Sequence, residues 1–152
     1  MLPELGSCYY PEHWPEDQWK SDAEQMVASG LTWVRIGEFA WSRIEPKEGE
    51  YNFQWLDHAI SILGEAGLNI VMSTPTAAPP RWLLDKWPDM SIVDSQGKTR
   101  KFGSRRHYCF SHEGYLQESL RITKMLAERY GKNTYIKVWQ FDNEYGCHDT
   151  NL

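Results

Sequence analysis

Apolar runs and amphipathic helical patterns alternate along the chain, and each apolar run ends in polar residues. The runs that predict strands are Gly6–Tyr10, Leu31–Ile36, Leu68–Ser73 and a stretch that begins at Thr134. Helical spacing of apolar residues predicts helices from about Pro15 to Gly30, from about Trp55 to Gly67 and over Glu113–Tyr130. Strands that are almost continuously apolar are typical of a parallel sheet covered by helices.

The third helix and the segment before it carry finer expectations. Apolar residues predict that the helix packs through one face, made of Leu116, Leu120, Thr123 and Ala127. Residues 81–108 are the least regular part of the chain, with a short helix expected at Arg81–Lys86. An excursion of this length inside a compact unit is more often functional than idle.

The order of the elements predicts the fold class. Successive βα units with a glycine after each helix imply a parallel α/β sheet with right-handed crossovers, either a closed (β/α)8 barrel or an open doubly wound sheet. No GxGxxG motif or P-loop follows the first strand, which favours the barrel. A barrel needs eight units and about 250 residues. We therefore expect residues 1–152 to form the N-terminal half of a (β/α)8 catalytic domain, a partial TIM barrel whose first and fourth strands are unpaired edges.

Composition excludes some classes of partner. The formal net charge of −5, without basic blocks, argues against nucleic acid and anionic membrane surfaces as partners. No stretch approaches the ~18 consecutive apolar residues of a membrane span, and the first residues lack a secretory pattern. The three cysteines form no CxxC pair, which fits a reducing compartment, so a cytoplasmic location is expected.

The last strand ends abruptly in Asp142, Asn143 and Glu144, where an α/β enzyme presents its chemistry. Glu144 is the candidate general acid, because partial burial at a barrel mouth raises a carboxyl pKa towards the operating pH; an ordinary capping or surface carboxylate is the alternative. Asn143 could orient a substrate hydroxyl or cap the loop. Neighbouring strand residues point to opposite faces, so both can serve one site only if the chain turns at residues 142–144.

Glycoside hydrolysis needs two carboxylates, and the chain offers one convincing candidate. Glu38 also follows a strand, but an ion pair with Arg35 is the favoured interpretation of this residue. Among the eight tryptophans, Trp41 and Trp82 are expected in loops where they could stack on a sugar ring.

Four motifs resemble the β-galactosidases of glycoside hydrolase family 42: CYYPEHWPEDQW from Cys8, FAWSRIEPKEGEYNFQWLD from Phe39, FGSRRHYCFS from Phe102 and FDNEYGCH from Phe141. The resemblance implies a retaining β-galactosidase that hydrolyses terminal β-D-galactosyl residues of oligosaccharides without a cofactor. It makes Glu144 the acid/base, Asn143 a ligand of the 2-hydroxyl, Arg105 a galactose ligand and Arg35 a second candidate. The family's nucleophile, a glutamate late in the barrel, is absent from this chain.

The resemblance also bears on metals and alternatives. Some family members bind a structural zinc through the cysteine that matches Cys109 and three more that would lie beyond Leu152, although a lone buried cysteine is commonly an apolar core residue. A barrel glycosidase of other specificity, acting on β-glucosides or α-L-arabinosides, and a non-catalytic sugar-binding fragment remain alternatives. We also expect the full-length protein to be a homo-oligomer.

Overall fold

The computed structural model describes residues 3–104 and 106–144. Within these residues, four parallel strands form one sheet in the order β1-β2-β3-β4: β1 (Gly6–Cys8), β2 (Trp33–Ile36), β3 (Asn69–Ser73) and β4 (Ile136–Gln140). Neighbours in sequence are neighbours in space, as successive right-handed βα units require. The predicted parallel α/β sheet is confirmed, with β1 and β4 at its edges.

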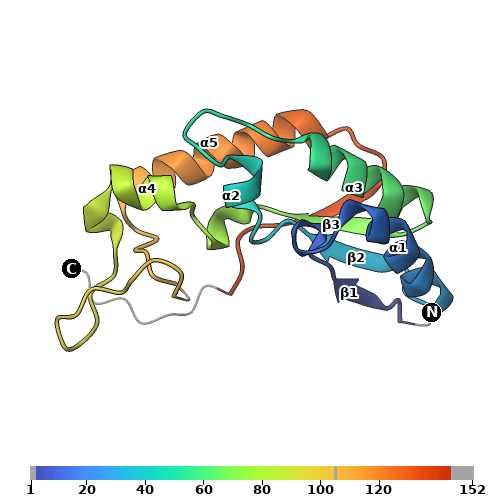
Figure 1. Ribbon diagram of the computed structural model, residues 1–152, viewed down its shortest axis with the longest axis horizontal. Coiled ribbons are helices and arrows are strands. Elements are labelled where there is room, and N and C mark those ends of the chain that lie inside the picture. Colours follow the sequence, from blue (N-terminus) through green and yellow to red (C-terminus); the bar gives the residue numbers. More distant parts are fainter. Residues whose placement is uncertain (1–2, 105, 145–152) are drawn as a thin grey trace.

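Three long helices connect the strands: α1 (Trp19–Ala28), α3 (Gln54–Glu65) and α5 (Glu113–Tyr130). They lie along the same side of the sheet (Figure 1). Right-handed crossovers that always step in one direction place every helix on one side, which is how a barrel wall begins to curve.

Two shorter helices follow strands, and one of them was not predicted. The expected helix at Arg81–Lys86 is present as α4 with the same bounds. The connection after β2 contains a helix that the sequence did not reveal, α2 (Trp41–Ile44). It is stabilised by burial of Trp41 and Ile44 and by a hydrogen bond from Trp41 Nε1 to Glu45 Oε2 at 3.0 Å. The burial depends on tertiary packing, which leaves little trace in local sequence.

Short 3-10 turns complete the connections. They cover Pro11–His13, Glu16–Gln18, Pro75–Ala77 and Pro88–Met90. Between α4 and α5 the chain leaves the layered part of the molecule and forms an irregular lobe at the end opposite the N-terminus (Figure 1). This lobe lies on the same side as residues 141–144, which follow β4, so it can contribute to a site at the carboxyl ends of the strands.

The core lies between the sheet and the helices. Its centre is formed by Val34 and Ile36 of β2, Ile70 and Met72 of β3, and apolar residues of α3 such as Leu56 and Leu63, all less than 2% exposed. Close approach of α3 to the sheet requires Gly64, because a Cβ atom there would meet the ring of Tyr135 at 2.1 Å.

The predicted packing face of α5 was wrong. Leu116 and Leu120 are 47% and 72% exposed, whereas Tyr115, Ile122 and Leu126 are buried. The buried stripe includes Glu118, whose carboxylate accepts hydrogen bonds from Lys86 Nζ at 2.8 Å and Arg121 Nε at 2.6 Å. A glutamate that carries its own partners can occupy a buried face, and an analysis of apolar spacing alone counts it as solvent-facing.

A matched pair of substitutions on α5 tests this packing. Leu126→Ala should lower the free energy of unfolding of the 152-residue chain by about 2–5 kcal/mol, because Leu126 is fully buried and its loss leaves a cavity. Leu120→Ala on the exposed face should change it by less than about 0.5 kcal/mol. Urea unfolding measures both. Equal losses of stability, or a larger loss for Leu120→Ala, would instead support the packing face that the sequence predicted.

Candidate functional site

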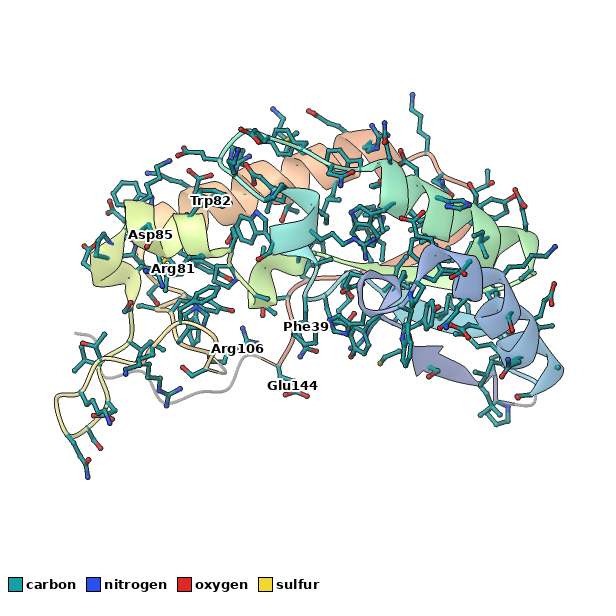
Figure 2. The ribbon with its side chains drawn as sticks, viewed as in Figure 1. Phe39, Arg81, Trp82, Asp85, Arg106 and Glu144 are labelled. Atoms are coloured by element: carbon teal, nitrogen blue, oxygen red, sulfur yellow. The ribbon has the colours of Figure 1, made fainter. Side chains whose placement is uncertain are left out.

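A cavity of about 770 Å³ opens at the carboxyl ends of the strands. Its lining includes Arg35 and Phe39 at and after β2, Arg106 and His107 in the irregular lobe, and Asn143 and Glu144 after β4, together with residues that follow β1 and β3. Three of the labelled side chains in Figure 2, Phe39, Arg106 and Glu144, belong to this lining. Parallel strands that end together gather residues distant in sequence at one rim.

The chain turns sharply after β4. Asp142 has φ 54° and Glu144 has φ 51°, which places both in the left-handed region that residues other than glycine seldom adopt. Each such residue costs of order 1 kcal/mol or more and persists only where the surroundings fix it. The turn expected from the Asn143–Glu144 pair is confirmed, and both residues line the cavity.

The buried carboxylate of Asp142 holds this turn in place. Oδ1 accepts hydrogen bonds from Arg106 Nη1 at 2.8 Å and from the Asn143 backbone N–H at 2.6 Å. Oδ2 accepts from Thr76 Oγ1 at 2.8 Å and Tyr115 Oη at 3.1 Å. The side chain is 0% exposed, so a charge that would be costly to bury alone is compensated by a cation and neutral donors.

The groups around Asp142 keep the protonation states that this network needs. Burial and the nearby Asp142 carboxylate raise the pKa of Tyr108 to about 12, and burial also raises the pKa of Tyr115. Both phenols therefore stay protonated near neutral pH. Burial opposes the charge on Arg106, but its hydrogen bond to Asp142 keeps the pKa of the guanidinium above its ordinary value.

Arg35 reaches the same rim from β2. Its Nη2 lies 2.7 Å from Oε1 of the fully buried Glu38, which confirms the ion pair that the sequence suggested. Its Nη1 donates to Gln140 Oε1 at 2.9 Å, and Gln140 Nε2 donates to the Asp142 carbonyl at 2.7 Å. Gln140 thus links one candidate sugar ligand to the turn that carries the other candidates.

The surroundings of Glu144 differ from the expectation. Glu144 lines the cavity but is exposed, whereas partial burial was expected. Figure 2 shows its side chain projecting from the end of β4 towards open space on the side of Phe39 and Arg106. Glu144 follows β4, which is an edge strand of the four-stranded sheet. The described residues therefore lie on one side of its carboxylate.

Of the two arginines of the Arg-Arg pair, the structure describes only the second. Arg105 lies outside the described residues. Arg106 forms a salt bridge to Asp142 and also lines the cavity.

Comparison with known proteins places these features in a family. The sequence profile of glycoside hydrolase family 42, described as beta-galactosidase, matches residues 8–152. The chain belongs to this family. A beta-galactosidase of Thermus thermophilus is 55% identical over 146 residues, which are 96% of this chain and 23% of that protein. The chain therefore spans about a quarter of the length of the curated relatives it matches.

Solved structures agree with the family assignment. The beta-galactosidase from the psychrophilic Marinomonas ef1 superposes with a TM-score of 0.93 at 51% identity, covering 97% of this chain and 23% of that one. The enzyme of the Antarctic haloarchaeon Halorubrum lacusprofundi gives 0.91 at 46%, covering 97% and 22%. These matches confirm that the four parallel strands with their alternating helices are the N-terminal part of a family 42 TIM barrel.

The metal prediction concerns Cys109, which is buried at 8% exposure. Among the residues that the structure describes, no three or more His, Cys, Asp or Glu side chains are grouped to hold a metal ion. His112 instead caps α5, because its Nδ1 accepts from Gly114 N at 3.1 Å. The zinc site of the family 42 resemblance stays a prediction that depends on residues outside this chain.

No helix in the described ranges is long and apolar enough to cross a membrane.

The aromatic residues of the cavity are not those that the sequence singled out. Trp41 is fully buried in α2 rather than in a loop, so its proposed role in sugar stacking was wrong. Trp82 lies in α4 and donates from Nε1 to the Glu45 carbonyl at 3.0 Å, and neither indole lines the cavity. Tyr10 and Phe39, stacked with ring centroids 5.9 Å apart, line it instead. The available signal was their position, since Tyr10 ends the first predicted strand and Phe39 follows the second.

His107 gives a pH-dependent test of how the lobe is built. Burial lowers the pKa of His107 below the ordinary 6.5. Its Nδ1–H donates a hydrogen bond to the Ser104 carbonyl oxygen at 2.8 Å. The unfolded chain then binds more protons between the two pKa values. The stability contributed by neutral His107 should be present above about pH 6.5 and lost as the pH falls through the folded pKa.

An NMR titration of the His107 ring in the folded chain should give a midpoint below 6.5, and the same ring in urea should titrate near 6.5. A folded midpoint at or above the urea value would contradict the buried, neutral imidazole.

Proposed function

We propose that this chain is the first part of the catalytic barrel of a retaining β-galactosidase that acts on terminal β-D-galactosyl residues of oligosaccharides. The observation that carries the proposal is the joint placement of Asn143, Glu144 and Arg35 on one cavity at the carboxyl ends of β2 and β4. The named activity of the family 42 relatives supports it.

Glu144 is the proposed acid/base. Its carboxyl gives a proton to the glycosidic oxygen as the bond from the anomeric carbon to that oxygen breaks, and its carboxylate later takes a proton from water. The exposed side chain has room for a sugar beside it, and Asn143, one residue earlier in the same turn, is suited to the 2-hydroxyl. Double displacement also needs a carboxylate nucleophile, which we assign to a segment of the full-length protein outside this chain.

Two arginines are the proposed cationic ligands of the galactosyl hydroxyls. Arg35 is half-buried and held by Glu38 and Gln140, so its guanidinium is oriented before substrate arrives. Arg105 follows from the match of its motif to the family. Arg106 is committed to Asp142 and Tyr108, which leaves Arg105 as the sugar ligand of the pair.

Three further properties are proposed for the full-length protein. They are a structural zinc bound through Cys109 together with ligands outside this chain, a homo-oligomeric assembly and a cytoplasmic location. Catalysis itself would require no cofactor, since two carboxylates suffice. The reducing-compartment pattern of the cysteines supports the cytoplasmic location, and the zinc follows from the family 42 resemblance alone.

Replacement of the proposed acid/base tests the function. In the full-length protein, Glu144→Gln should lower kcat/KM for lactose by about 10²–10⁴-fold, because the leaving sugar then departs without a proton. A 2,4-dinitrophenyl galactoside, whose leaving group needs no proton, should lose far less in kcat/KM. Azide should raise kcat with this activated substrate, since a small anion can replace the water that needs a general base.

Glu128→Gln is the matched control, because Glu128 is an exposed glutamate on α5 far from the cavity lining. It should leave both substrates unchanged. Near-normal lactose hydrolysis by Glu144→Gln would remove Glu144 from its assigned role, and a wild-type protein inactive on every galactoside would refute the proposed function.

A further inference from the structure

Two segments that supply the proposed site are joined by one buried contact. The lobe residues 102–107 include the Arg-Arg pair, and the turn 142–144 carries Asn143 and Glu144. Arg106 Nη1 donates to Asp142 Oδ1 at 2.8 Å, with the two side chains 5% and 0% exposed. The segments are 36 residues apart in sequence, so this ion pair fixes their relative position.

The same carboxylate is tied to the scaffold below the turn. Thr76, in the connection after β3, and Tyr115, in the first turn of α5, both donate to Oδ2, and Tyr115 Oη is also 3.0 Å from the Thr76 carbonyl. The Asp142 backbone N–H donates to Thr74 Oγ1 at 2.8 Å. Asp142 thus connects the turn to the ends of β3 and α5 as well as to the lobe.

Asp142 is placed to orient and not to react. Asp142 is among the residues that line the cavity, but four donors already occupy its two oxygens and its side chain is 0% exposed. The Asn143 backbone N–H is one of those donors, which ties the Asp142–Asn143 peptide, one residue before Glu144, to the carboxylate. Positive φ at both Asp142 and Glu144 means that the direction of the Glu144 side chain depends on this turn being kept.

We propose that Asp142 is a positioning residue for the acid/base: its buried carboxylate, paired with Arg106, sets the direction from which Glu144 delivers its proton to the leaving oxygen. The inference rests on the proposed function. A displacement of a catalytic group by about 1 Å can lower the rate 10²-fold. Loss of the Asp142 carboxylate should therefore slow proton transfer from Glu144, although Asp142 touches no substrate. The defect should appear wherever the leaving group needs that proton.

Asp142→Asn in the full-length protein tests the proposal with little change in volume. The amide has one accepting oxygen where the carboxylate has two, so either Arg106 or the Thr76 and Tyr115 hydroxyls lose their acceptor. We expect kcat/KM for lactose to fall about 100-fold and that for 2,4-dinitrophenyl galactoside to fall less than about 5-fold. Tyr115→Phe removes a single donor and should leave the protein folded. It should also lower kcat/KM for lactose more than kcat/KM for the activated galactoside, but by a smaller factor than Asp142→Asn.

Glu45→Gln is the matched control. Glu45 is also a fully buried carboxylate with an arginine partner, Arg121 Nη2 at 2.8 Å, but it lies outside the cavity lining. It should lower stability and leave the ratio of the two kcat/KM values at the wild-type value.

Each outcome decides the question. A larger loss on lactose than on the activated galactoside, for Asp142→Asn and not for Glu45→Gln, supports the positioning role. Equal losses on both substrates in Asp142→Asn and Tyr115→Phe would show a merely structural carboxylate and overturn it. A wild-type protein without galactosidase activity would instead overturn the proposed function, and the positioning role with it.

Discussion

A buried negative charge at the end of β4 is the constraint around which the site is arranged. The Asp142 carboxylate would be costly to bury alone, so the fold must bring Arg106, Thr76 and Tyr115 to it from three separate parts of the chain. Meeting that requirement fixes the lobe, the end of β3 and the start of α5 relative to one another. The strained turn that presents Asn143 and Glu144 is stabilised by the same contacts.

A second buried carboxylate has the corresponding function in the scaffold. Glu45 accepts from Trp41 Nε1, the Gly49 backbone N–H and Arg121 Nη2, and so joins the connection after β2 to α5. Glu118, Lys86 and Arg121 extend this network to α4. Polar residues therefore join the helices beyond the strand ends, where α2 and α4 also contribute Trp41, Ile44 and Leu83 to the apolar core.

The sequence predicted those features that depend on local pattern. Apolar runs and glycines located all four strands and the three long helices, and the polar residues after β2 and β4 indicated the rim of the site. Features that depend on distant partners escaped it. Glu118 on the buried face of α5 and the central position of Asp142 are explained by side chains tens of residues away, and Trp41 is buried by the packing of the core. Arg35 with Glu38, three residues apart, could be inferred because both partners are local.

A crystal structure of the full-length Glu144→Gln protein with lactose bound would show whether position 144 meets the glycosidic oxygen. We expect its side chain within about 3.2 Å of that oxygen, with the Asp142 carboxylate still bound to Arg106, Thr76 and Tyr115 and out of contact with the sugar. A glycosidic oxygen beyond the reach of position 144, or a sugar hydroxyl bonded to Asp142, would contradict this expectation.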